Sequence, residues 1–308
     1  MTRDGVRFGI GMPQVFPAGR ADPEFIARFL ARAEALGYHS AWVQEQIIGT
    51  VPIMEPVTLL AFAAAHTRRM LLGTAVLLTP IRNPVQLAKS LATVDHLSGG
   101  RLIAGVGLGA AGIPTYAAFG VPTERRVRRF VEGVHVMRKL WTEEQATFHG
   151  TFYRLDGISM EPKPVQKPHP PIWIGAHHPS AVRRAIRLGD GFVGAGTAST
   201  AQFRDEVGVI RRTLAEAGRD PATFPLSKRV YIAVDRDRGQ AERRLVEWFA
   251  ERYRGRHDAQ RVAVYGNVDD CAAGLREAAA AGASLLILNP VFDEMEHLEA
   301  LAEVQRRL

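Results

Sequence analysis

Cysteine is almost absent from this chain of 308 residues, because Cys271 is the only one. A single thiol excludes a disulfide within the chain, a cysteine-based zinc site and a redox-active cysteine pair. Long apolar runs are absent too, since no stretch of about 18 or more hydrophobic residues occurs. The charged Arg3 and Asp4 follow Met1 where a secretory leader would begin. We therefore expect a soluble cytoplasmic protein without a cleaved signal or a membrane partner.

Lysine is scarce among the 39 basic residues. The lysines are Lys89, Lys139, Lys163, Lys167 and Lys228. We place the first four in helices or in a long connection. We place Lys228 at the start of a strand, on the wrong face of a barrel for catalysis. This distribution argues against Schiff-base chemistry of the aldolase type.

Metal-binding patterns are missing as well. His177 and His178 are adjacent, so their side chains cannot bind one ion as an i, i+4 pair would. No other predicted strand end pairs a histidine with a carboxylate, and we expect no metal site. The net charge of +7 comes from basic residues scattered among acidic ones. This pattern argues against nucleic-acid binding and is compatible with an anionic cofactor.

Short β-branched runs alternate with segments of helical periodicity, which predicts βα units around a parallel sheet. The expected strands are residues 7–12, 40–45, 70–78, 102–107, 171–176, 191–196, 228–234 and 285–290. Helices are expected to begin near Pro23, Pro56, Pro84, Thr123, Pro179, Thr200, Arg238 and Asp269. Eight such units in 308 residues predict a single-domain (β/α)₈ barrel that spans residues 1–308.

Two connections are longer than a simple βα unit. Residues 107–170 separate the fourth and fifth expected strands, and their last part is rich in proline, glycine and aromatic residues. We expect an insertion here, with a short extended segment over the barrel. Residues 252–267 carry several basic side chains before the last strand. We expect a loop excursion there, at the barrel end that holds active sites.

Small residues gather at the expected strand ends, in residues 105–109, 175–178 and 194–196. They would let the backbone approach a large planar or phosphorylated ligand closely. Ser180 lies at the start of a helix, where free N–H groups suit a phosphate. An alternative stays open, in which these glycines only form tight turns.

Together these segments resemble the luciferase-like monooxygenase superfamily, in particular its branch of oxidoreductases that use the deazaflavin coenzyme F420. The resemblance spans most of the chain. The matching motifs are ALGYHSAWV at residues 35–43, LATVDHLSGGR at 91–101, PKPVQKPHPPIWIG at 162–175 and GDG at 189–191. The Pro-rich run that enters a strand is the most specific of them.

The resemblance implies a cofactor across the C-terminal mouth of the barrel, with its ring over the third strand and its phosphate after the fifth. It also implies a cis peptide between Ala75 and Val76. The positions carried over are Glu45, Gln46, Ala75, Val76, Leu78, Thr79, Gly109, Ala110 and Ile113 around the ring, Ala176, His177, His178 and Ser180 near the phosphate, and Gly194 and Gly196 toward the substrate.

This chain departs from the family pattern at the positions for proton transfer. Many relatives have Asp-His where it has Glu45-Gln46, and an acidic residue where it has Ala110. Glutamine cannot exchange a proton near neutral pH. Glu45, Gln46 and His177 are our catalytic candidates, with His178, Tyr116 or water as other proton donors. Glu45 binding only backbone N–H groups, and histidines facing solvent, remain alternatives.

We expect hydride transfer between F420 and a small organic substrate. The main alternative is an FMN-dependent monooxygenase that uses O₂, and a third is a barrel that binds its ligand without turnover. The resemblance also implies a homodimer.

Overall fold

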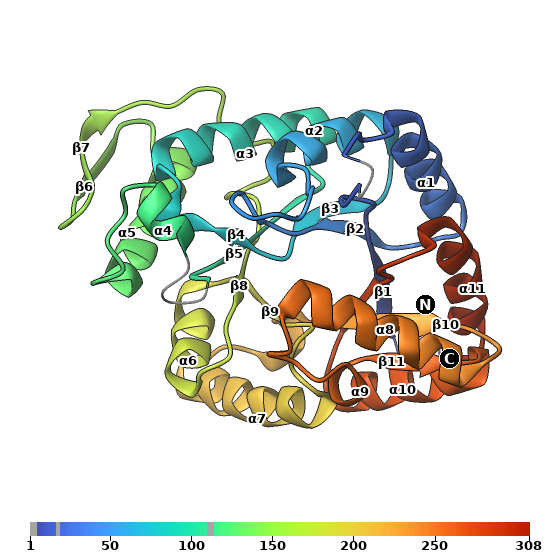
Figure 1. Ribbon diagram of the computed structural model, residues 1–308. Helices are drawn as coiled ribbons and strands as arrows, with labels where there is room; N and C mark the ends of the chain where they lie inside the picture. Colours follow the sequence, from blue (N-terminus) through green and yellow to red (C-terminus); the bar gives the residue numbers. More distant parts are fainter. Residues whose placement is uncertain (1–4, 17–18, 110–113) are drawn as a thin grey trace.

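The computed structural model describes residues 5–16, 19–109 and 114–308 of the protein. Within these residues, parallel strands close into a barrel, and helices surround it (Figure 1). The barrel strands are β1 (Arg7–Gly11), β2 (Ser40–Val43), β3 (Leu71–Thr74), β5 (Leu102–Gly107), β8 (Ile172–Gly175), β9 (Gly191–Gly194), β10 (Leu226–Val234) and β12 (Leu285–Asn289). Hydrogen bonds between β9 and β10 close the ring. The predicted (β/α)₈ barrel is confirmed.

The helices cover the outer face of the barrel strands. They are α1 (Pro23–Ala35), α2 (Pro56–His66), α3 (Pro84–Ser98), α5 (Arg126–Thr142), α6 (Pro179–Leu188), α7 (Thr200–Glu216), α10 (Val268–Ala280) and α11 (Glu294–Arg306). Four of them begin with proline, where the missing N–H costs nothing. The residue before each proline caps its helix, as Asn83 does by accepting from the N–H groups of Val85 and Gln86. Helix α11 was not among the predicted helices.

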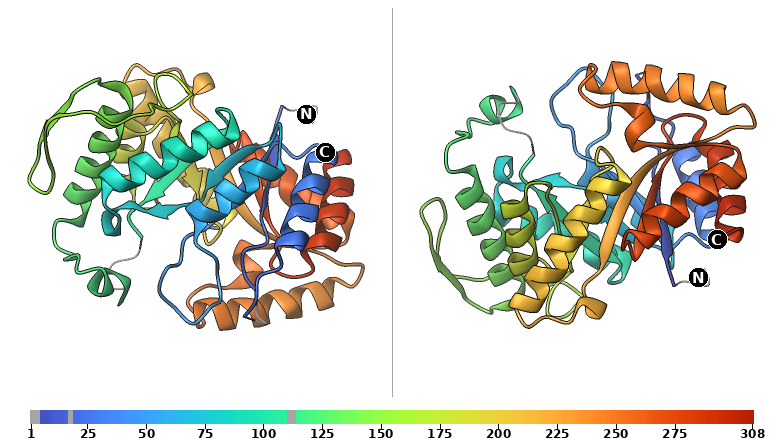
Figure 2. Two further views of the ribbon diagram at one scale, coloured as in Figure 1. Left: turned by 90° about the horizontal axis from the view of Figure 1, so that it is seen from above. Right: turned by 90° about the horizontal axis from the view of Figure 1, so that it is seen from below.

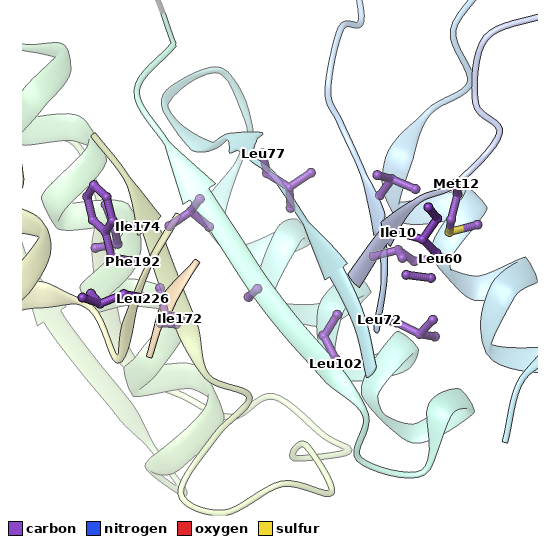
Figure 3. Close-up of a cluster of buried hydrophobic side chains, with 14 of the residues drawn as sticks. Ile10, Met12, Leu60, Leu72, Leu77, Leu102, Ile172, Ile174, Phe192 and Leu226 are labelled. Atoms are coloured by element: carbon purple, nitrogen blue, oxygen red, sulfur yellow. The ribbon is translucent and has the colours of Figure 1, made fainter. Parts of the chain in front are cut away.

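Two separate hydrophobic layers hold the barrel. Strand side chains that point outward pack under the helices, and Figure 3 shows Leu72, Leu102 and Ile172 on successive strands of this layer. Inside the barrel, the rings of Trp42 and Trp173 lie 5.6 Å apart and form a second cluster with aliphatic neighbours. These two tryptophans fill the barrel below the strand ends, so they are core residues.

The connection between β5 and β8 contains an antiparallel hairpin of β6 (Ala146–His149) and β7 (Arg154–Ile158). It follows α5 and the short helix α4 (Pro114–Ala118). An extended segment was predicted here, but over the barrel. Figure 2 instead shows the hairpin projecting outside the ring of helices. The ammonium group of Lys163 donates to the carbonyl of Leu140 at 2.9 Å and ties this insertion to α5.

The region between β10 and β12 differs most from the prediction. Helix α8 (Arg238–Tyr253) is followed by α9 (Ala259–Val262) and β11 (Val264–Gly266), which extends the sheet beside β10. Much of the loop expected at residues 252–267 is therefore ordered secondary structure. Figure 2 shows α8 at the same end of the barrel as the segment between β2 and α2. An additional helix thus lies at the barrel mouth.

Three shorter elements complete the fold. The expected strand at residues 70–78 is interrupted, because β4 (Leu77–Leu78) pairs with the end of β5 after a break at Ala75 and Val76. The 3₁₀ turns are η1 (Thr79–Ile81) and η2 (Pro221–Thr223). Lys228 does not open its strand as predicted, since β10 begins at Leu226.

Candidate functional site

A cavity of about 590 Å³ opens at the C-terminal ends of the barrel strands. Its lining comes from segments that follow β2, β3, β5, β8 and β9, from β4 and β10 themselves, and from α5, α6 and the end of α8. Active sites of (β/α)₈ enzymes lie at this end of the barrel, because the strand ends and their loops converge there. Of the predicted site residues, Glu45, Ala75, Val76, Leu78, Gly109, Ala176, His177, Gly194 and Gly196 line the cavity.

One wall of the cavity is apolar and is built around Val76. The peptide between Ala75 and Val76 is cis, as predicted. A Cβ added at Gly107 would lie 2.6 Å from Cγ2 of Val76, and one at Gly175 would lie 3.1 Å from Cγ1. A side chain at Gly107 would overlap Val76 and one at Gly175 would crowd it, so the two glycines let β5 and β8 form a cradle for the interrupted strand. With Ala75 and Leu78, this wall presents a surface suited to a planar ring.

Glu45 lies beside this wall, but its carboxylate is fully engaged. It accepts a hydrogen bond from the backbone N–H of Leu78 and pairs with Arg82, whose Nε lies 2.7 Å from Oε1. The same guanidinium reaches Glu55 at 2.7 Å. The side chain of Glu45 is completely buried. Its observed contacts are thus those of a structural group that fixes β4 relative to β2, although the alternative interpretation named backbone N–H groups alone and not Arg82.

Several other predicted residues lie away from the cavity. The amide of Gln46 packs against Gly49, and Thr79 is buried in η1 with a hydroxyl that has no hydrogen-bond partner. Tyr116 is buried, its hydroxyl donates to the carbonyl of Leu108, and burial raises its pKa. None of these three side chains lines the cavity. Ala110 and Ile113 lie outside the described residues.

The two adjacent histidines have different surroundings. His177 lines the cavity, and its Nδ1 lies 3.0 Å from Oε1 of Glu206 on α7. His178 caps α6, where its Nδ1 lies 2.9 Å from the hydroxyl of Ser180. Both His178 and Ser180 are exposed, and neither lines the cavity. Only Ala176, His177 and Ala181 bring this loop and helix to the cavity.

The opposite wall holds residues that the sequence did not single out. Arg229 on β10 is 8% exposed, and its Nε donates to Oδ1 of Asn289 at 2.9 Å. Its Nη2 donates to the hydroxyl of Tyr231 at 2.8 Å, and that hydroxyl bonds with Tyr253 at the end of α8. Burial raises the pKa of Tyr231, so this phenol stays neutral. Arg229 and Tyr231 are two residues apart, a spacing that places both on one strand face.

A family model for luciferase-like monooxygenases matches residues 6–305. The chain belongs to the luciferase-like monooxygenase family. The resemblance inferred from the sequence motifs is therefore confirmed. The Pro-rich motif of this family is held by Asp95, which accepts from the backbone N–H and the side-chain amide of Gln166 at 3.0 and 2.7 Å.

Similar proteins in this family include F420-dependent enzymes and a monooxygenase. An F420-dependent glucose-6-phosphate dehydrogenase from Nakamurella multipartita is 30% identical over 256 residues, 80% of this chain and 73% of that protein. Monooxygenase RslO1 from Streptomyces bottropensis is 27% identical, with a TM-score of 0.81 over 97% of this chain and 98% of its own. An F420-dependent secondary alcohol dehydrogenase in complex with an F420-acetone adduct is 20% identical, with a TM-score of 0.84 and the same coverage. The last similarity shows the fold alone.

In residues 5–16, 19–109 and 114–308, no group of three or more histidine, cysteine or carboxylate side chains is placed to hold a metal ion. Across the same ranges, no helix has the length and apolar character needed to cross a membrane. The cavity at the strand ends is therefore the candidate site for this member of the luciferase-like family.

Proposed function

We propose that this chain is an F420-dependent oxidoreductase that transfers a hydride between the coenzyme and a small organic substrate. The proposal rests on the apolar wall of Ala75, Val76 and Leu78, here called the Val76 wall. It is found in a chain that is 30% identical to an F420-dependent dehydrogenase. The coenzyme, when bound, supplies the hydride carrier. The protein then has to bind the ring, orient the substrate and exclude water.

The residues that line the cavity fit such a group. Ala75, Val76 and Leu78 would contact the ring, since they form an apolar wall without a side chain projecting from Gly107. Gly109, Ala176 and His177 would lie along the rest of the coenzyme, with Arg126 supplying positive charge for its phosphate. Gly194 and Gly196 leave room for the substrate. Gln46, Thr79, His178 and Ser180 do not line the cavity and stay predictions. Ala110 and Ile113, which lie outside the described residues, also stay predictions.

Proton exchange is assigned to His177 in this proposal. Glu45 is engaged by Arg82 and Leu78, and Gln46 does not titrate. Glu206 faces Nδ1 of His177, which leaves Nε2 as the atom that can exchange a proton with the substrate. A His177→Gln variant should lower kcat and flatten its pH profile. An unchanged profile would remove His177 from this role.

The test of the cofactor is a fluorescence titration of the purified protein with F420 and with FMN. We expect F420 fluorescence to be quenched on binding, with a weaker response for FMN. Tight binding of FMN alone would contradict the proposal. A hydride acceptor or donor can then be sought by following the absorbance of F420 with panels of carbonyl compounds, imines, activated alkenes and alcohols.

A second candidate function is supported by the similarity to monooxygenase RslO1, which extends over 97% of this chain. In that case, reduced FMN and O₂ would serve the same cavity. Oxygen consumption that depends on a substrate and on reduced FMN would favour this candidate. Binding of neither cofactor would favour a barrel that binds its ligand without turnover. A homodimer and a cytoplasmic location remain predictions, and light scattering tests the first.

A further inference from the structure

The wall of the cavity formed by β10 and α8 carries positive charge that no carboxylate balances. Among the described residues, the guanidinium of Arg229 bonds with the neutral side chains of Asn289 and Tyr231 and lies 4.7 Å from the centre of the Tyr231 ring, with no carboxylate beside it. Arg252 lies at the end of α8, and its buried Nη1 has no hydrogen-bond partner in the part of the chain that the structure describes. Among the described residues, neither arginine forms an ion pair. Burying a cation without a partner is costly, so such groups persist mainly where a ligand completes them.

The rest of the cavity lining does not supply the missing negative charge. Among the described residues that line it, Glu45 is the only carboxylate, and Arg82 and the N–H of Leu78 already engage it. His177 and His257 also line the cavity, but Glu206 faces His177 and burial lowers the pKa of His257, so the positive charge comes from the arginines. The cavity therefore has an excess of hydrogen-bond donors with positive charge, beside a lining that is otherwise mostly aliphatic and aromatic.

The barrel separates these arginines from the wall assigned to the cofactor ring. The strand order is β10, β12, β1, β2, β3, β5, β8, β9 and back to β10, so β3 and β10 lie opposite each other. A ring against Ala75 and Val76 would face Arg229 across the cavity. The space between them is where a substrate must lie to contact the ring. The two arginines are thus placed to bind the substrate and not the ring.

We propose that the substrate is an organic anion whose carboxylate-sized group binds Arg229 and Arg252. Nε and one N–H of Nη2 of Arg229 are already bonded to Asn289 and Tyr231, so a carboxylate would accept hydrogen bonds from the remaining N–H groups on Nη1 and Nη2, which are parallel donors at matching spacing. The rings of Tyr231 and Tyr253 lie beside the arginines. They would contact an apolar part of the ligand. The position of the anion opposite the ring rests on the proposed function, but the preference for an anion does not.

The test compares benzoate with benzamide, which have similar shape and differ in charge. Their dissociation constants are measured by calorimetry with the protein free of cofactor and again with F420 present. We expect the free protein to bind benzoate at least about tenfold more tightly than benzamide, the effect of one charged hydrogen bond. This preference should weaken with added salt, because salt screens the charges. With F420 bound, the protein should still bind benzoate more tightly than benzamide.

Variants decide which arginines are responsible. Arg229→Gln and Arg252→Gln should each lose most of the preference for benzoate, while Arg229→Lys should keep part of it. Arg252 is only partly buried on a peripheral helix, so its variant remains informative if the core variant does not fold. Arg243→Gln is the matched control, because Arg243 lies exposed on the same helix. Arg126→Gln, on the cofactor side, should keep the preference and weaken F420 binding.

Three results with the benzoate and benzamide pair would overturn this inference. They are equal affinity for benzoate and benzamide, no benzoate binding by the wild-type protein, and loss of the preference in Arg126→Gln but not in the Arg229 and Arg252 variants. Failure of the proposed function looks different, because the free protein would still prefer benzoate while F420 did not bind. Loss of F420 binding in Arg229→Gln would instead assign this arginine to the cofactor and also contradict the proposal.

Discussion

The two opposite walls of the cavity differ in whether their buried charges are paired. On the wall of β2 to β5, buried charges are paired, since Glu45 and Glu55 both contact Arg82. Close packing is achieved there by glycines that face Val76. On the wall of β10 and α8, Arg229 is buried without a carboxylate. The first wall is built for shape and stability, whereas the second retains an electrostatic cost that a ligand can relieve.

The largest expected effect comes from breaking the paired wall. Glu45→Gln leaves Arg82 without its buried partner, and we expect the free energy of unfolding in urea to fall by about 3 to 5 kcal/mol. Glu55→Gln is the control, because Glu55 is partly exposed and caps α2 through the N–H of Thr58. Its expected loss is about 1 kcal/mol. Equal losses in the two variants would contradict the distinction between a buried pair and its exposed extension.

The second prediction concerns the outer face of β10. Lys228 is 2% exposed, and its ammonium group donates to the carbonyl oxygens of Ala195 and Ala198 at 2.7 Å. Burial lowers the pKa of Lys228 from its ordinary value of 10.5 to about 7. Between these two values the unfolded chain binds more protons than the folded one. Stability should therefore rise with pH in this window.

A Lys228→Met variant isolates this contribution. The difference in unfolding free energy between wild type and variant should shift in favour of wild type by about 1.4 kcal/mol per pH unit above pH 7. Below about pH 7 the difference should be constant, because both states of the wild type then hold the proton. Lys139→Met is the comparison, because it removes a half-buried lysine of α5 that pairs with Glu143 and not a fully buried one. If the unfolding free energies of wild type and Lys228→Met change in parallel with pH, burial does not lower the pKa of Lys228.

Packing against Val76 gives a third, smaller effect. Gly107→Ala places a methyl group 2.6 Å from Val76 and pushes that side chain toward the cavity. We expect a loss of about 1 to 3 kcal/mol in unfolding free energy, as for other overpacked cores. The dissociation constant of F420, measured by fluorescence quenching, should rise about tenfold, which equals about 1.4 kcal/mol of binding free energy.

The control for this substitution lies on α7. Gly208 has only Arg212 near its added Cβ, at 3.7 Å. Gly208→Ala should therefore stabilise the protein by up to about 1 kcal/mol, because alanine favours a helix, and should leave F420 binding unchanged. Unchanged cofactor affinity in Gly107→Ala would remove the Val76 wall from the proposed ring site.

The two walls also differ in how far the sequence predicts them. The family resemblance led to Ala75 and Val76, and the clusters of small residues led to the glycines at the strand ends, because these short-range patterns reflect backbone needs. The sequence does not single out Arg229, because both faces of a barrel strand are buried. The alternation of side chains along the strand therefore does not show which of them point into the barrel. The carboxylate of Glu45 is engaged by Arg82, which lies 37 residues further along the chain, so the local sequence does not reveal this pairing. Helix α8 reaches the mouth through tertiary packing of Tyr253 and Trp248 on Tyr231, which periodicity does not reveal.

The smallest expected change is on the unpaired wall. Arg229→Met removes a buried cation together with its bonds to Asn289 and Tyr231, so the lost bonds and the relieved desolvation oppose each other. We expect unfolding free energy within about 1 kcal/mol of wild type. Arg101→Met is the comparison, because Arg101 donates to the carbonyls of Ser98 and Met70 at 2.6 and 2.7 Å. Its removal leaves buried acceptors unpaired and should cost roughly 3 kcal/mol. If both variants lose the same stability, Arg229 is a structural residue like Arg101, and its unbalanced charge gives no reason to expect an anionic ligand.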